Sequence, residues 1–92
     1  MKIKVLKDRA KEMEIEVESE SENLLNPLKE KLLEIDEVVY AEYYKEHPLL
    51  SNPKIYVKTK KERPREVIKR ALRELYEEVK SFREQVEKAA NP

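Results

Sequence analysis

Residues 64–88 read PREVIKRALRELYEEVKSFREQVEK and form the stretch that decides the fold. Its apolar side chains recur at steps of three and four residues, which places them on one face of an α-helix. They are Val67, Ile68, Ala71, Leu72, Leu75, Val79, Phe82 and Val86. Such a helix would extend about 38 Å, whereas the strands predicted below would extend roughly 20 Å. We therefore expect the helix up to about Leu75, including Leu72, to pack on a sheet and its second half to bind another chain.

The composition favours one soluble, cytoplasmic domain over residues 1–92, with 89–92 as a frayed tail. Charged residues make up 43% of the chain, against about 25% in an average protein. The 20 basic and 20 acidic side chains cancel, so attraction to nucleic acid or to an anionic membrane is not expected. The sequence has no cysteine and no long apolar run. It also has no glycine, which with the many charges is typical of a hyperthermophile protein or a redesigned sequence.

Alternating apolar residues predict a β-hairpin near the N-terminus. Ile3 and Val5 alternate with lysines, and Met13, Ile15 and Val17 alternate with glutamates. Pairing Ile3 with Val17 and Val5 with Ile15 places the apolar side chains on one face. The same pairing sets lysines opposite glutamates, so charge and hydrophobicity favour one register.

Three further elements lie between the hairpin and the long helix. Residues 24–35 predict an amphipathic helix that begins near Asn23, or at Asn26 with Pro27 as its first residue. Residues 38–44 and 54–59 predict strands. The order predicts an α+β domain, ββαββα, with a four-stranded, mainly antiparallel sheet and two helices on one of its faces.

The third predicted strand has apolar groups on both faces. Simple alternation places Val39, Ala41 and Tyr43 on one face, with Val38 and the remaining tyrosines on the other. This pattern predicts a sheet that is covered, or an edge that lies against a partner.

Residues 38–53, VVYAEYYKEHPLLSNP, resemble the strand-and-loop signature of archaeal RNA polymerase subunit L. That signature reads roughly V-x-F-A-S-Y, then H-P-L, often continuing L-S-N-P. The run Leu24-Leu25-Asn26, followed by Leu28, is similar to the first-helix run of the family, and a proline opening a long last helix also fits. The likeness covers nearly the whole chain in order and spacing. Residues 19–23 and Glu42 depart from the family pattern.

The resemblance implies a non-catalytic assembly subunit. In that family, the L subunit forms a heterodimer with a D-like partner subunit through helices of both proteins, and the large polymerase subunits assemble on this platform. The partner-binding residues predicted here are Leu24, Leu25, Leu28, Leu32, Tyr76, Val79, Phe82 and Val86. The competing hypothesis is a stand-alone or redesigned domain of the same fold, monomeric or homodimeric, with no polymerase role.

Catalytic, cofactor and metal sites are not predicted. His47 is the only histidine and is read as a structural loop residue, and the glutamates of the second strand are read as a solvated face. A basic patch is the basis of a third, weaker hypothesis, a nucleic-acid-binding module. It comprises Lys60, Lys61, Arg63, Arg65, Lys69, Arg70 and Arg73. A solvated helix face is the more common meaning of such a patch.

Overall fold

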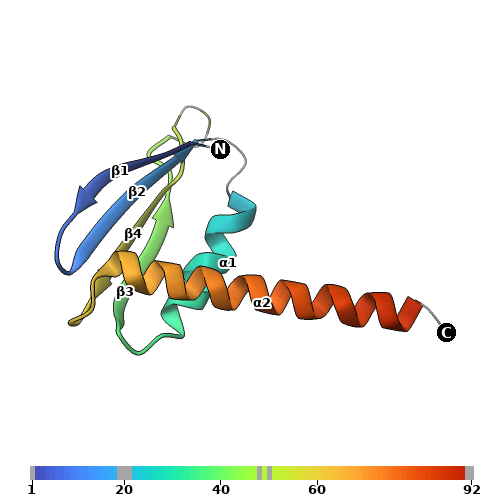
Figure 1. The fold of residues 1–92 in the computed structure, drawn as a ribbon. Helices are drawn as coiled ribbons and strands as arrows, with labels where there is room; N and C mark the ends of the chain where they lie inside the picture. Colours follow the sequence, from blue (N-terminus) through green and yellow to red (C-terminus); the bar gives the residue numbers. More distant parts are fainter. Residues whose placement is uncertain (1, 19–21, 48, 50, 91–92) are drawn as a thin grey trace.

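The computed structural model has the predicted order of elements (Figure 1). It describes residues 2–18, 22–47, 49 and 51–90. The elements are β1 (Lys2–Asp8), β2 (Glu12–Glu18), α1 (Glu22–Leu33), β3 (Val38–Tyr44), β4 (Lys54–Thr59) and α2 (Pro64–Ala90). The predicted ββαββα architecture is confirmed. The altered segment before the first helix lies largely outside the described residues, as does half of the predicted tail.

The four strands form one sheet in the order β1-β2-β4-β3, and every neighbouring pair is antiparallel. In the β1–β2 hairpin, Ile3 lies opposite Val17 and Val5 opposite Ile15, which is the predicted register. The lysines of β1 lie opposite glutamates of β2 over the same stretch. A bulge between Val5 and Lys7 ends this regular pairing.

The alternation predicted for β3 is wrong at its start. The register shifts between Val38 and Tyr40, so that Val38 lies opposite Thr59 and Tyr40 opposite Lys58. Val38 consequently packs against the core, and Val39 is exposed. A bulge adds one residue to one strand and reverses the faces of the side chains beyond it. Ala41 and Tyr43 lie on one face, as predicted, and that face packs against the core.

α1 begins at Glu22, one residue before the first of its two predicted start points. The alternative start at Asn26 is therefore wrong, and Pro27 lies inside the helix. Proline has no N–H to bond the carbonyl four residues earlier, so this helix loses one hydrogen bond in its second turn. The helix ends at Leu33, and Ile35 belongs to the following turn, where its side chain still packs against the core.

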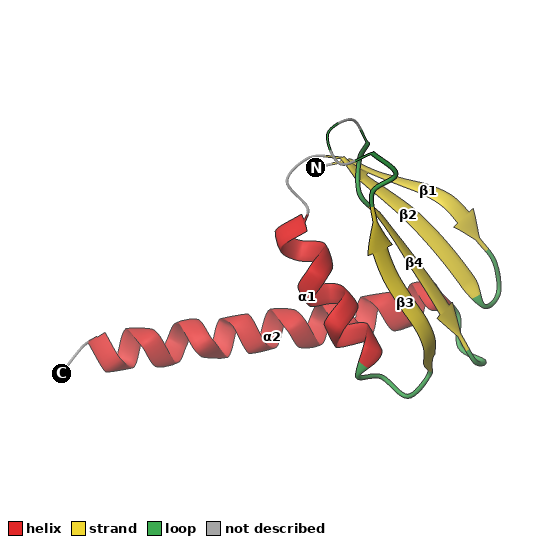
Figure 2. Cartoon of the chain, turned by 180° about the vertical axis from the view of Figure 1, so that it is seen from behind, coloured by secondary structure: helices red, strands yellow, loops and turns green. Residues whose placement is uncertain are grey.

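Both helices cover the same face of the sheet (Figure 2). The core combines inward side chains of β2, β3 and β4 with α1 and the first two turns of α2. Its buried members are Met13, Val17, Leu25, Leu28, Leu32, Ala41, Ile55, Val57, Val67, Ile68 and Ala71. Apolar burial of this kind is the main stabilising term of the domain.

The turn from β4 into α2 is held by a carboxylate rather than by a glycine. The carboxylate oxygen Oε1 of Glu37 accepts the backbone N–H groups of Lys61 and Glu62, the latter at 2.7 Å. The N–H of Lys60 donates to the backbone oxygen of Glu37 at 3.0 Å, and the buried hydroxyl of Thr59 donates to the carbonyl of Glu62. The hydrogen bonds from Glu62 and Lys61 lower the pKa of Glu37. This contact joins the turn after α1 to the turn that precedes α2.

Substitutions of Leu32 and Leu33, which are adjacent at the end of α1, can test where the core lies. Leu32 is 0% exposed and Leu33 is 50% exposed. Leu32→Ala should lower the free energy of unfolding by about 2–5 kcal/mol, because it leaves a cavity. Leu33→Ala should change it by less than about 0.5 kcal/mol. Urea denaturation measures both, and equal effects would contradict this placement of the core.

The Glu37 contact predicts a dependence of stability on pH. A carboxyl whose pKa is lower in the folded than in the unfolded chain stabilises the fold above its ordinary pKa of 4.5, and this contribution is lost as the pH falls through the folded value. Glu37→Ala should therefore lower the melting temperature most near neutral pH, and the difference from the parent chain should shrink in acid. Glu84→Ala, an exposed position on α2, is the control. A difference that does not vary with pH would exclude ionised Glu37 as its cause.

Candidate partner-binding site

α2 extends well beyond the sheet that it covers. Its 27 residues span about 40 Å, whereas strands of six or seven residues span roughly 20 Å. Figure 1 shows the second half of α2 projecting past the sheet and α1. The buried residues of α2 are Pro64, Val67, Ile68 and Ala71, and each described residue after Ala71 is half-buried or exposed.

The part of α2 that belongs to the core ends one turn earlier than predicted. Leu72 is 38% exposed, and Leu75 is half-buried. The sequence predicted that both would pack on the sheet, which is wrong for Leu72. By this point α2 has passed the sheet and lies beside α1.

Beyond the core, the apolar side chains of α2 form one continuous line that the chain leaves open, which we call the seam. It comprises Leu72, Leu75, Val79, Phe82 and Val86. The spacing alternates between three and four residues, as in a coiled coil. Phe82 is 70% exposed, and Val79, Val86 and the neighbouring Tyr76 are also exposed. A contiguous exposed apolar surface of this kind is typical of an interaction site.

A groove between α1 and α2 continues the seam towards the body of the domain. It has a volume of about 350 Å³ and is lined by Leu24, Pro27, Leu72, Leu75, Tyr76 and Val79. Its lining is almost entirely apolar, so it suits a hydrophobic side chain rather than a polar ligand.

An ion pair fixes the two walls of this groove. The ammonium of Lys31 on α1 donates to the carboxylate of Glu78 on α2, and it also lies 3.5 Å from Glu34. The hydrogen bond to Glu78 raises the pKa of Lys31. Because Glu78 directly precedes Val79, the pair holds α1 against the seam where the groove ends.

The structure divides the predicted partner-binding residues into two groups. Leu24, Tyr76, Val79, Phe82 and Val86 lie on the groove or the seam. Leu25, Leu28 and Leu32 are instead buried in the core of the chain itself, so they offer almost no accessible surface to a partner. Periodicity shows that one face of a helix is apolar, but not whether the chain or a partner covers it.

Three groove residues were missed by the sequence reasoning: Pro27, Leu72 and Leu75. The heptad-like spacing that joins Leu72 and Leu75 to Val79 is the signal that identifies two of them. Pro27 carries no such signal. Its position on the groove depends on α1 beginning at Glu22, about one turn before the alternative predicted start at Asn26.

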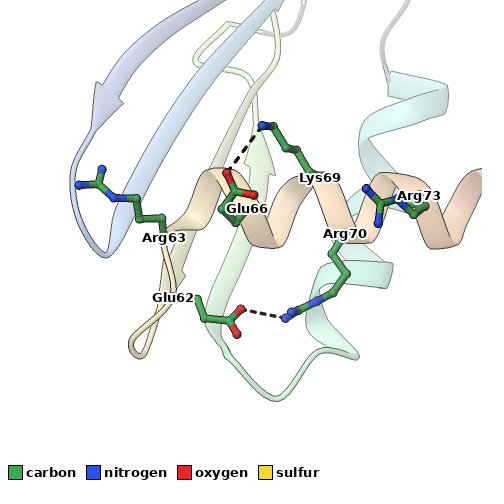
Figure 3. A pocket seen from close by; sticks show the side chains of 6 residues that line it. All are labelled: Glu62, Arg63, Glu66, Lys69, Arg70 and Arg73. Atoms are coloured by element: carbon green, nitrogen blue, oxygen red, sulfur yellow. Dashed lines mark ion pairs between the residues drawn. The ribbon is translucent and has the colours of Figure 1, made fainter.

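Three of the seven basic residues of the patch at the start of α2 form ion pairs within the chain, two of which are drawn in Figure 3. Arg70 lies 3.1 Å from Glu62, Lys69 lies 3.6 Å from Glu66, and Arg65 lies 2.5 Å from Asp8 on β1. The first two pairs line a shallow groove of about 450 Å³. Arg63 also lines it, but its side chain points away from the other basic groups. The charges around this groove are therefore mixed, unlike the continuous basic stripe that is typical of nucleic-acid binding.

The face of the sheet opposite the helices carries a network of tyrosines and glutamates. Tyr44 donates its hydroxyl to Glu14 at 3.1 Å, and Tyr56 donates to Glu12. The second hydrogen bond lowers the pKa of Glu12 and raises that of Tyr56 to about 12. These hydrogen bonds tie glutamates of β2 to tyrosines of β3 and β4 on this face of the sheet.

His47 closes its own loop. Its backbone N–H donates to the hydroxyl oxygen of Ser51 at 3.1 Å, and its carbonyl accepts the N–H of Ser51 at 3.1 Å. Within the described ranges, His, Cys, Asp and Glu side chains do not gather in a group of three that could hold a metal ion. None of the helices that the structure describes combines the length and the apolar character needed to cross a membrane.

Comparisons with known proteins agree with this geometry. The family described as "RNA polymerase Rpb3/Rpb11 dimerisation domain" matches residues 12–85. DNA-directed RNA polymerase subunit Rpo11 of Thermoplasma volcanium is 40% identical over 74 residues, which are 80% of this chain and 67% of that protein. Rpo11 of Methanococcoides burtonii is 38% identical over 82 residues, which are 89% of this chain and 90% of that protein.

The fold also matches a solved structure. The crystal structure of DNA-directed RNA polymerase subunit L from Thermoplasma acidophilum superposes with a TM-score of 0.86 at 33% identity, covering 96% of this chain and 87% of that one. The resemblance to subunit L found in the sequence is confirmed. The homologues of this chain are RNA polymerase subunits that are non-catalytic by themselves. The chain belongs to the Rpb3/Rpb11 dimerisation-domain family, with archaeal Rpo11, or subunit L, proteins as its homologues.

Proposed function

We propose that this chain is the L component of an archaeal-type RNA polymerase, working in the cytoplasm, and that it binds a D-like partner subunit through the seam and the groove. The heterodimer then serves as the platform on which the large catalytic subunits assemble. The observation that carries the proposal is the exposed seam on the second half of α2. The chain that carries this seam belongs to a family described as a dimerisation domain.

The seam fits a helix of the partner. Alternating steps of three and four residues keep the apolar side chains on one line, against which a second helix can place its own side chains. Phe82 is the main anchor, because aromatic side chains near the centre of an interface contribute most to binding. It lies between Val79 and Val86, so apolar contacts flank it on both sides.

The groove supplies a second point of attachment. A partner helix that follows the seam towards the sheet reaches the groove at Val79, where Leu75 and Leu24 lie on opposite walls. A hydrophobic side chain inserted there would fix the partner along the helix axis. The Lys31–Glu78 ion pair links the two walls in the chain without its partner, and a groove that exists before binding lowers the entropic cost of association.

Charged groups beside the seam limit which partners bind. Arg83, next to Phe82, forms an ion pair with Glu87 at 3.2 Å on the exposed side of the helix. Exposed charges at such flanking positions select the partner and its orientation more than they add affinity.

Substituting the anchors of the seam tests the proposal. The double variant Phe82→Glu and Val86→Glu should bind a purified archaeal D-like protein at least about 30-fold more weakly, since anchor residues contribute about 2 kcal/mol or more. Both side chains are exposed in the free chain, so the fold should be unaffected. Isothermal titration calorimetry measures the affinity, and circular dichroism verifies the fold.

Glu84→Lys is the matched control, because residue 84 lies on the face of α2 opposite residues 82 and 86. It should leave the affinity within about threefold of the parent chain. Unchanged binding by the double variant would exclude the seam as the interface. A parent chain that ignores the D-like protein would overturn the assembly function itself.

A homodimer is the second candidate. The seam and groove lie side by side on one chain, so two copies arranged antiparallel could each place Phe82 towards the groove of the other, as two-fold symmetry requires. Sedimentation of the chain alone and with the D-like protein separates the candidates. A homodimer that persists in the mixture favours the second, and its replacement by a 1:1 heterodimer favours the first.

A further inference from the structure

β1 carries a second exposed apolar surface, far from the seam. Ile3 is 62% exposed and Val5 is 49% exposed. Ile3 lies opposite Val17, which is buried, so both point to the side of the sheet that the helices cover. The helices reach β2, β3 and β4 but leave this part of β1 open (Figure 1).

β1 is also an open edge of the sheet. It is the first strand in the order, and among the residues that the structure describes it pairs only with β2. Alternate residues of an edge strand direct their N–H and C=O groups away from the sheet, where another strand can bond to them. The bulge after Val5 limits the regular part of this edge to residues 2–5.

The lysines of this edge indicate the kind of strand that fits. Lys2 and Lys4 lie opposite Glu18 and Glu16 in the register, and neither forms an ion pair with another described residue. Both side chains are exposed. A second copy of β1 would place lysine near lysine, so self-pairing at this edge is disfavoured. An acidic strand meets no such repulsion.

The strand already paired with β1 shows what complements it. β2 reads EMEIEVE and places glutamates opposite the lysines and apolar residues opposite Ile3 and Val5. We propose that the free edge of β1 binds an extended segment of a partner protein, in which acidic and apolar residues alternate, as a fifth strand. Its carboxylates would meet Lys2 and Lys4, and its apolar side chains would extend the surface of Ile3 and Val5.

The opposite edge of the sheet lacks these features. β3 reads VVYAEYY, has its bulge near its start, and contains no lysine. Its Tyr40 donates to Glu42 at 2.7 Å, so a carboxylate already lies on this edge. An acidic strand is therefore expected at β1 and not at β3. This inference does not depend on the seam or on the partner that binds it.

The test uses the whole chain and two synthetic peptides, EMEIEVE and KMKIKVK, which differ only in whether glutamate or lysine alternates with the apolar residues. In amide ¹H–¹⁵N spectra, the acidic peptide should give saturable shifts in residues 2–5 and slow their hydrogen exchange, and added salt should weaken the effect. The lysine peptide should not. Binding of neither peptide, equal binding of both, or shifts centred on β3 or α2 would overturn the proposal.

Charge reversal supplies the matched variant. Lys2→Glu with Lys4→Glu should reverse the preference, so that KMKIKVK binds and EMEIEVE does not. Lys60→Glu with Lys61→Glu, in the turn before α2, should leave the preference of the parent chain intact. If the first variant fails to fold, Lys2→Gln with Lys4→Gln removes the charge alone. That variant should lose the preference for the acidic peptide, and a preference that survives would refute the role of the lysines.

Discussion

A helix of 27 residues on a sheet of six- and seven-residue strands is the constraint on which the rest of the structure depends. The sheet can bury only the first two turns of α2, through Val67, Ile68 and Ala71. The part of α2 after Ala71 has no buried residues to anchor it, so interactions within the helix itself must keep it helical. It is rich in Glu, Lys, Arg and Leu, which have high helix propensity, and Arg83 pairs with Glu87 four residues later. Because these local interactions keep the helix ordered before any partner binds, less conformational entropy would be lost when a partner covers the seam.

The short sheet gives α1 two roles. Its inward leucines, Leu25, Leu28 and Leu32, close the core that α2 leaves uncovered. Its outer side, with Leu24 and Pro27, forms one wall of the groove. Loss of the core leucines would therefore alter the groove indirectly, by moving α1. For this reason the surface residues of α2 report on partner binding more directly than α1 does.

The sequence predicted the features in which two independent signals agreed. The β1–β2 register was predicted because hydrophobic alternation and charge pairing favour the same alignment. The bulge in β3 was not, because Val38 and Val39 are identical side chains and only the pairing with β4 distinguishes them. The burial of the α1 leucines within the chain was not predicted for a similar reason, since an apolar helix face looks alike whether the chain itself or a partner buries it. The place where the core ends, at Ala71, depends on the angle at which α2 leaves the sheet. The turn at this exit includes a contact of Glu37 with residues 61 and 62, which are distant from it in sequence, so no local pattern reveals it.

On both of the proposed binding surfaces, affinity and selectivity would be carried by different side chains. On α2, apolar residues supply the area to be buried, and Arg83 and Glu78 lie beside them. On β1, Ile3 and Val5 supply the area, and Lys2 and Lys4 lie on the other face. Apolar contact alone would accept many partners, itself included, because the hydrophobic effect is not directional. Charges that flank an apolar strip exclude the wrong partners at little cost to the right one. A chain with 43% charged residues and no net charge can therefore expose two apolar surfaces and still bind selectively.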